Sequence, residues 1–382
     1  MKSQTIHYLD NSATTKPCPQ SAEAVIQCLN EDYGNPSSLH GMGTKAFKIM
    51  ENARKIIADS IKCSPDCITF TSCATESTNT ALIGTAEKYG RKRKKIITTS
   101  VEHSSVSEVC NYLESKGFEI VRIPPDENGE ITYQQIISAV DDNTCLVSMM
   151  LVNNETGYIL PVEKTFFGIK KLYPHVITHC DCVQAYMKIP VNTRKLNADF
   201  ISLSGHKVHA PKGIGVLYTA KGIRIHGLLY GGGQEKNFRS GTESVPLIAG
   251  FGKAVEVYSK NMNERYEYIS ELKKYLVEKL SEIDGITFNS KENSLPYITN
   301  VSVEGIRSEI MLHFLEERNV FISSGSACSK GAKSGVLSEF GISDKNADSA
   351  LRISLCDDND KADIDALIDG IRNGMENIKK KR

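Results

Sequence analysis

Short apolar runs rich in β-branched residues alternate with segments of helical periodicity between about residues 45 and 255. Runs of this kind, bounded by polar turns, are typical of strands that are buried on both faces. The predicted strands are 67–72, 95–100, 119–124, 144–152, 175–180, 199–204 and 215–218. Strands that alternate with helices need crossover connections, so the pattern predicts an α/β fold with a mostly parallel sheet.

The pattern changes after about residue 260. Apolar residues then recur every three or four positions and form one stripe on a long predicted helix: Ile269, Leu272, Leu276, Leu280 and Ile283. Two further strands, 297–304 and 320–324, flank a helix through 311–317. This second part is typical of a small α+β domain.

Composition narrows the possible partners and the compartment. The 46 basic residues balance the 46 acidic ones, so we expect neither nucleic acid nor membrane as a partner. No apolar run is long enough to span a bilayer, and the first ten residues lack the apolar core of a secretion signal. The cysteine count is eleven, an odd number that argues against a disulfide framework, so we expect a reducing cytoplasm.

Lys207 is the first candidate for chemistry. It follows the predicted strand 199–204 directly and lies beside Ser204 and His206. A lysine held at a strand end next to such donors suits a covalent link to an aldehyde cofactor that carries a phosphate. A pyridine ring in that cofactor needs an acid to keep its nitrogen protonated, and Asp181 at the end of another strand is suited to that role.

The segment around Asp181, "HCDCVQ", also holds three metal-ligand types. Strand alternation places His179 and Asp181 on one side and Cys180 and Cys182 on the other, which weakens a metal hypothesis. The spacing in "CSPDC" differs from that of a zinc pair. We therefore expect no metal ion.

A phosphate group needs hydrogen-bond donors. In "FTSCATESTN" (70–79) a strand is followed by a turn of small residues and the start of a helix, whose free amides with Thr75 can bind an anion. Alone, this is only a helix start. Together with Ser204, His206 and the "RSGT" turn (239–242), it predicts a phosphate-binding cup.

These motifs, with others, resemble one enzyme family in their order and spacing. They are "YLDNSATTK", "GNPSSLH", "ATES", "EHSSV", "VNNETG", "HCDCVQ", "SGHK", "GGGQE", "RSGT", "SSGSAC" and "LRIS". The set resembles the pyridoxal-phosphate (PLP) cysteine desulfurases of the iron–sulfur-cluster-assembly type, in the class V aminotransferase group. The resemblance implies conversion of L-cysteine to L-alanine and transfer of the sulfur, as a persulfide on Cys328, to an acceptor protein.

The same resemblance implies a fold and an assembly. The fold is the aspartate-aminotransferase-like one, with a mostly parallel sheet in a large PLP-binding domain and a small α+β domain. We expect the large domain to span 15–258 and the small domain to combine 1–14 with 259–382. The active form would be a homodimer.

Roles for individual residues also follow from the resemblance. The implied catalytic residues are Lys207, which holds the cofactor and moves the substrate Cα proton, His103, which stacks on the ring, and Cys328, the nucleophile. Arg352 and Asn154 would contact the substrate. The implied cofactor-binding residues are Ala74, Thr75, His103, Asn154, Asp181, Gln184, Ser204, His206 and Lys207, with Thr242 from the other subunit.

The chain departs from the family pattern at three positions. Cys73, Cys182 and Cys356 stand where glycine or alanine is usual, and all three are expected near the cofactor. Cys182 would place its sulfur against the ring face opposite His103. A small buriable residue and a retuned pocket are both compatible with these cysteines.

Other functions remain open on the sequence alone. A selenocysteine lyase would use the same scaffold, and a class V aminotransferase would make Cys328 incidental. A non-catalytic partner protein is the third alternative, and the intact set of Lys207, Asp181, His103 and Arg352 argues against it.

Overall fold

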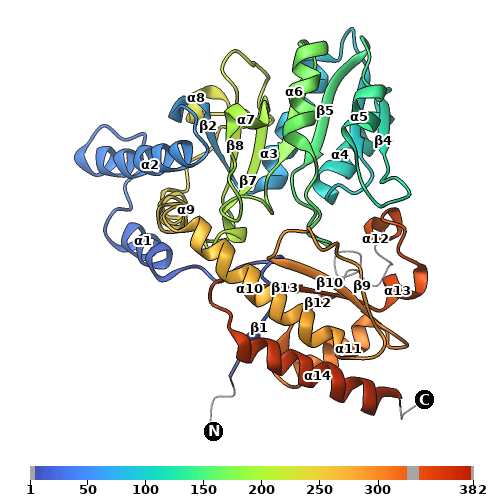
Figure 1. Ribbon diagram of the computed structural model, residues 1–382. Coiled ribbons are helices and arrows are strands. Elements are labelled where there is room, and N and C mark those ends of the chain that lie inside the picture. The colour runs from blue at the N-terminus through green and yellow to red at the C-terminus, as the bar shows by residue number, and fades with distance from the viewer. Residues whose placement is uncertain (1–4, 325–334, 380–382) are drawn as a thin grey trace.

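The chain folds around two main sheets of different character (Figure 1). The structure is a computed structural model that describes residues 5–324 and 335–379. The larger sheet has the strand order β2-β8-β7-β6-β5-β3-β4, and the smaller has the order β12-β13-β10-β9. The strands of the larger sheet are β2 (Ile68–Thr71), β3 (Lys95–Thr99), β4 (Glu119–Ile123), β5 (Thr144–Met150), β6 (Ile177–Asp181), β7 (Phe200–Ser204) and β8 (Gly215–Thr219).

The larger sheet confirms the prediction of a mostly parallel α/β fold. Strands β4, β3, β5, β6 and β7 pair in parallel, while β8 runs antiparallel to both of its neighbours. All seven predicted strands form, with ends shifted by one or two residues; the strand predicted over 144–152 stops at Met150. Burial on both faces explains why these strands read as continuous apolar runs.

Helices cover both faces of this sheet. Leu146 packs into a cluster with α3 and α4, and its neighbour Val147 into a cluster with α5 and α6, because successive side chains alternate across a strand. The helices in this part of the chain are α1 (Pro19–Asn30), α2 (Gly41–Ser60), α3 (Ala74–Tyr89), α4 (Ser104–Ser115), α5 (Tyr133–Ala139), α6 (Val162–Leu172), α7 (Thr193–Leu196), α8 (Gln234–Asn237) and α9 (Val245–Tyr258), with short 3-10 turns η1 (Pro65–Cys67) and η2 (Gly205–Lys207).

Helices α11 and α14 lie on the side of the smaller sheet away from the larger sheet, whereas α12 and α13 lie beside the smaller sheet (Figure 1). The predicted apolar stripe lies on α10, where four of its residues are buried, and Ile283 follows the end of that helix. The elements here are β9 (Ile286–Phe288), β10 (Ile298–Val303), β12 (Ser323–Ser324), β13 (Ala350–Ser354), α10 (Met262–Ser281), α11 (Ser308–Glu316), α12 (Gly335–Glu339), α13 (Asp344–Asp348) and α14 (Lys361–Lys379).

The N-terminal segment joins this second part, far from its neighbours in the sequence. Strand β1 (His7–Tyr8) pairs in parallel with β11 (Val320–Phe321), and Asp10 forms a bridge with Ser354. The strand predicted over 320–324 is therefore divided into β11 and β12, which pair with different strands. The domain boundaries expected above stay a prediction. Among the described helices, none combines the length and apolar character needed to cross a bilayer.

Candidate active site

A cavity of about 360 Å³ lies at the carboxyl ends of β6 and β7, where the two sheets face one another. It is lined by residues from both parts of the chain: Asp10, Ser12, Ala13, Cys73, Ala74, Thr75, His103, Ser105, Met150, Val152, Asn154, Asp181, Val183, Gln184, Ser204, His206, Lys207, Ser323 and Arg352. Ten predicted site residues are in this set. Thr242 is exposed and is not among them, and Cys328 lies outside the described residues.

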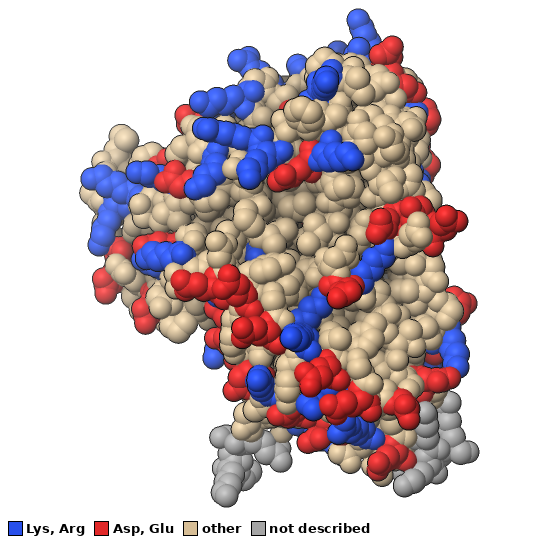
Figure 2. All heavy atoms as spheres, viewed as in Figure 1, with Lys and Arg blue, Asp and Glu red and all other residues tan. Residues whose placement is uncertain are grey.

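A larger hollow of about 930 Å³ lies elsewhere, lined by Lys62, Arg194, Tyr218 and Lys221 among others. In the view of Figure 2, Lys and Arg side chains gather over the part of the surface that carries α7. Basic and acidic side chains are mixed over the lower part of the same view. None of the predicted site residues lines this hollow. The smaller cavity is therefore the candidate active site.

Lys207 lines the cavity. It ends η2, the 3-10 turn that follows β7 directly, and its Nζ donates hydrogen bonds to the carbonyl oxygens of Ser12 at 2.5 Å and Ala13 at 2.7 Å. Two backbone acceptors thus hold the amine in one position. The N-terminal segment that provides them comes from almost two hundred residues away in the sequence.

Asp181 is the last residue of β6 and points into the cavity. Its Oδ1 accepts a hydrogen bond from the Val183 amide at 2.9 Å. Burial raises the pKa of Asp181, and the hydrogen bond from Val183 and the nearby charge of Lys207 partly oppose that rise. A buried carboxylate is stabilised by a cationic partner, so a protonated ring nitrogen is the kind of group that this position suits.

His103 caps the start of α4 from the cavity side. Its Nδ1 accepts the Ser105 amide hydrogen at 3.1 Å, which places the remaining ring proton on Nε2. Burial lowers the pKa of His103, so the imidazole is neutral at pH 7. A neutral, oriented ring can stack on a planar cofactor without repelling a positive charge there.

The turn before α3 supplies free backbone amides to the cavity. The helix begins at Ala74 without a side-chain cap, so its first N–H groups remain available to an anion. Gly215 on β8 permits this arrangement, because a Cβ there would lie 2.5 Å from the carbonyl carbon of Cys73. Ser204 and His206 line the same side, and burial lowers the pKa of His206 to about 4.

Arg352 projects from β13 on the opposite side. Its Nη2 donates to Asp10 Oδ1 and its Nη1 to the carbonyl oxygen of Asn154, both at 3.1 Å. Its buried Nε has no hydrogen-bond partner among the described residues. A guanidinium with an unused donor in a cavity is suited to bind a carboxylate.

The cavity donors match the groups of a pyridoxal phosphate. The amine of Lys207, the buried acid Asp181 and the amides of α3 are suited to an aldehyde carbon, a ring nitrogen and a phosphate, respectively. Gln184 lies between them, with its Nε2 donating to Ser12 O at 3.0 Å and its Oε1 accepting from Lys188 at 2.8 Å. The residues present therefore fit this cofactor.

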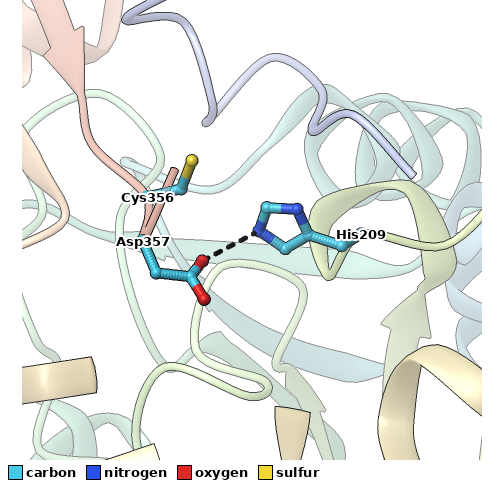
Figure 3. Close-up of side chains that lie close together, drawn as sticks. All are labelled: His209, Cys356 and Asp357. Carbon is cyan, nitrogen blue, oxygen red and sulfur yellow. Dashed lines mark ion pairs between the residues drawn. The ribbon is translucent and has the colours of Figure 1, made fainter. Parts of the chain in front are cut away.

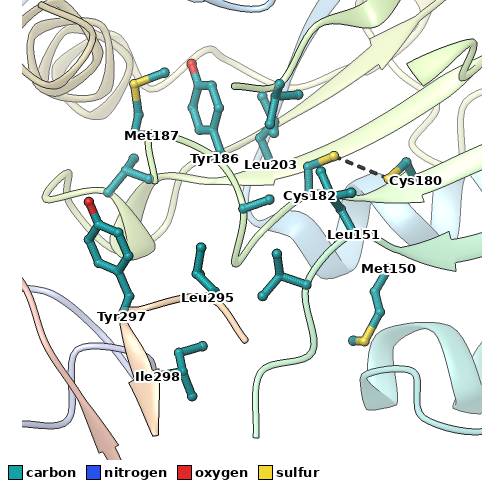
Figure 4. Packing of buried hydrophobic residues seen from close by; sticks show 14 of the residues in the cluster. Met150, Leu151, Cys180, Cys182, Tyr186, Met187, Leu203, Leu295, Tyr297 and Ile298 are labelled. Atoms are coloured by element: carbon teal, nitrogen blue, oxygen red, sulfur yellow. Dashed lines mark hydrogen bonds between the residues drawn. The ribbon is translucent and has the colours of Figure 1, made fainter. Parts of the chain in front are cut away.

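Two of the three unusual cysteines are not where we expected them. Cys73 lines the cavity, but Cys182 packs in the core with its Sγ 3.4 Å from that of Cys180 (Figure 4). The prediction that its sulfur faces the ring was wrong, because alternation along β6 turns Cys182 away once Asp181 points inward. Val183 lines the cavity instead. Cys356 is also absent from the lining and lies beyond the end of β13.

His179 is a core residue. Its two ring nitrogens lie 2.8 Å from Ser148 Oγ and 2.9 Å from Ser202 Oγ, and burial lowers its pKa to about 3. Asp10, Ser12 and Ala13 are among the cavity residues to which sequence reasoning gave no role. The motif "YLDNSATTK" marked their segment, but its position in the fold depends on long-range pairing.

Comparisons with known proteins show the family of this chain. The aminotransferase class-V family matches residues 7–367. The chain is 37% identical to "Cysteine desulfurase IscS" of Methanosarcina thermophila, covering 95% of this chain and 90% of the relative. It is 38% identical to "Cysteine desulfurase IscS" of Dictyoglomus turgidum, covering 97% and 95%.

Solved structures give the same result. A "NIFS-LIKE PROTEIN" superposes with a TM-score of 0.93 at 38% identity, over 97% of this chain and all of the other. "SspA in complex with cysteine" superposes with a TM-score of 0.82 at 35% identity, over 92% and 99%. The predicted resemblance and fold class are confirmed.

Proposed function

This chain belongs to the aminotransferase class-V family, and from that premise we propose that it is a PLP-dependent cysteine desulfurase. It converts L-cysteine to L-alanine and retains the sulfur as a persulfide on Cys328. The observation that carries the proposal is the convergence of Lys207, Asp181, His103 and Arg352 on one cavity. Near-full-length relatives named cysteine desulfurase support it.

The cofactor would be held along one side of the cavity. Lys207 would provide its covalent attachment, Asp181 would pair with the ring nitrogen, and His103 would cover one ring face. Gln184 and Asn154 would contact the phenolic oxygen. The phosphate would be bound by Ala74, Thr75, Ser204 and His206, together with Thr242 of a second copy. When bound, the pyridine ring withdraws electrons from the substrate Cα and makes its proton acidic.

The protein residues then divide the work on L-cysteine. Arg352 binds the substrate carboxylate through its unused donor, and Lys207 Nζ removes the Cα proton and later returns one. The Cys328 thiolate attacks the substrate sulfur and forms the new S–S bond. The Cβ–S bond of the substrate breaks at the same time, and the electron pair of that bond stays on Cβ. Proton transfer to that carbon completes alanine.

We propose three further features of this function. The active form is a homodimer, since Thr242 is exposed and does not line the cavity of its own chain. The protein works in the cytoplasm, in keeping with ten described cysteines that are all free thiols. A separate acceptor protein takes the sulfur for iron–sulfur clusters or another sulfur-containing product.

The test is a single turnover of the PLP-loaded enzyme with L-cysteine, followed by mass spectrometry of the digested protein. We expect alanine and a persulfide on Cys328 in equal amounts, without any keto acid. Cys328→Ala should leave the cofactor bound but stop sulfur transfer. Amino transfer that depends on an added keto acid, with no persulfide, would identify an aminotransferase instead. A persulfide mainly on Cys73 or Cys182 would reject the assignment of Cys328.

A further inference from the structure

Three side chains with metal-binding atoms lie close together in a small cavity that Lys207 also lines. His209, Cys356 and Asp357 each offer one such atom, and the three atoms all lie within 4.8 Å of one another. Figure 3 shows the side chains pointing together from two places, the loop after η2 and the end of β13. The proposed desulfurase function gives none of them a role.

His209 is oriented as a ligand. Its Nδ1 lies 3.0 Å from the carbonyl oxygen of Lys16, which can only accept, so Nδ1 carries the proton and Nε2 presents a lone pair. The ring stacks on Tyr258 with centroids 4.4 Å apart, which fixes its plane. Metal-binding histidines are commonly fixed by such a bond from the other nitrogen.

This orientation leaves two acceptors facing each other. Nε2 of His209 lies 3.7 Å from Oδ1 of Asp357, too far for a direct hydrogen bond. A cation between them would bind both atoms. Two ligand atoms each about 2.1 Å from a tetrahedral ion lie about 3.4 Å apart, close to the observed separation.

We propose that His209, Cys356 and Asp357 bind one zinc ion, with water as the fourth ligand. The combination of one sulfur, one imidazole nitrogen and one carboxylate suits zinc better than magnesium or calcium. Thiolate and carboxylate together neutralise the two charges of the ion, so the loaded site has no net charge to bury. The Asp357 side chain is 30% exposed, which leaves a way in for the ion and the water.

The basic residues around the three ligands favour a zinc site without net charge. Lys188 and Arg265 line the same small cavity as the three ligands and would oppose an uncompensated cation. The three ligands belong to segments that only the fold brings together, so the sequence alone did not indicate a metal site there.

Zinc at this place would connect the two sides of the active site. His209 follows Lys207 by two residues, and Cys356 follows Arg352 by four. The ion would tie the loop of the catalytic lysine to the strand of the substrate-binding arginine. We expect it to stabilise their relative position without contacting the substrate.

The first experiment measures zinc in the full-length, PLP-loaded protein after removal with a chelator, reloading with zinc and desalting. We expect about one zinc per chain in the wild type, as in three-ligand sites with one water. X-ray absorption at the zinc edge should show a single sulfur at about 2.3 Å and lighter ligands at about 2.0–2.1 Å. Failure of the folded protein to retain zinc, or a zinc shell without sulfur, would overturn the proposal.

Variants then test the ligands one by one. Cys356→Ala and His209→Gln should each lower zinc affinity at least about tenfold. Cys110→Ala removes a buried thiol outside the cluster, and Cys328→Ala removes the proposed catalytic thiol; both should bind zinc like the wild type. Circular dichroism checks that each variant is folded. Unchanged zinc binding in folded Cys356→Ala, or loss of zinc in Cys328→Ala, would place the ion elsewhere and overturn the assignment.

Discussion

The two walls of the active-site cavity are built in different ways. One wall, here called the cofactor wall, consists of Lys207, Asp181 and His103 at strand ends and helix starts of the larger sheet. The other, the substrate wall, consists of Arg352 on β13 and Asp10 from the N-terminal segment, which form an ion pair at 3.1 Å. The first wall depends mostly on short sequence motifs, whereas the second depends on a contact between residues at opposite ends of the chain.

This difference suits two separate tasks. The cofactor wall holds buried titratable groups, and burial lowers the pKa of His103 and raises that of Asp181. The substrate wall keeps a permanent positive charge with an unused donor at Nε of Arg352. Changes to the cofactor wall should therefore affect the chemical step, and changes to the substrate wall should affect substrate binding.

The largest effect is expected from Lys207→Ala in the cofactor wall. The change removes both the attachment point and the proton carrier, so alanine formation should fall about 10³-fold or more. Lys212→Ala is the matched control, because Lys212 is an exposed lysine in the same loop. Alanine formation within tenfold of the wild-type rate, roughly the loss of one ordinary contact, would contradict the assignment.

Asp181→Asn keeps the shape of the side chain but removes its charge. Loss of a charge-assisted pair costs about 1.5–3 kcal/mol, so the turnover rate should fall about 10- to 100-fold. The absorption band of the bound cofactor should shift as well. Asp199→Asn alters a buried acid that pairs with Lys170 away from the cavity and should leave that band unchanged. An unshifted band in Asp181→Asn would separate Asp181 from the cofactor.

Arg352→Lys tests the substrate wall. A lysine keeps the positive charge but cannot make the planar, two-pronged contact, so KM for L-cysteine should rise about 10-fold while kcat changes less. Arg318→Lys on the surface beyond α11 serves as the control. A fall in kcat at unchanged KM would mean that Arg352 acts in the chemical step, and the division between the walls would fail.

The smallest effect is expected on folding stability and comes from His179, a buried residue on the same strand as Asp181. The unfolded chain protonates His179 near pH 6.5, but the folded chain does so only near 3, so folding stability should fall as the pH drops through that window. The slope due to His179 is about 1.4 kcal/mol per pH unit. Urea unfolding between pH 7 and about 4.5 should show this slope in the wild type and less in His179→Gln. The exposed His313→Gln should match the wild type.

Much of the larger sheet could be predicted because its information is local. Each strand is buried on both faces and reads as an apolar run, and ligands of such sheets bind at the carboxyl ends of the strands. Lys207 and Asp181 were found in this way. The error at Cys182 arose because neighbouring residues of an extended segment point to opposite sides. Asp181 points into the cavity, so Cys182, which follows it directly, points into the core.

Local patterns in the sequence were enough to predict the alternation of strands and helices, the mostly parallel sheet, the apolar stripe of α10 and the residues of the cofactor wall. Only the tertiary structure placed Ser12 and Ala13 against Lys207, paired Asp10 with Arg352, and brought His209 to Cys356 and Asp357. The reason is physical. Periodicity and turn residues act over a few positions, whereas these contacts join segments that meet only when the two sheets pack and the N-terminal segment pairs with both β11 and the end of β13.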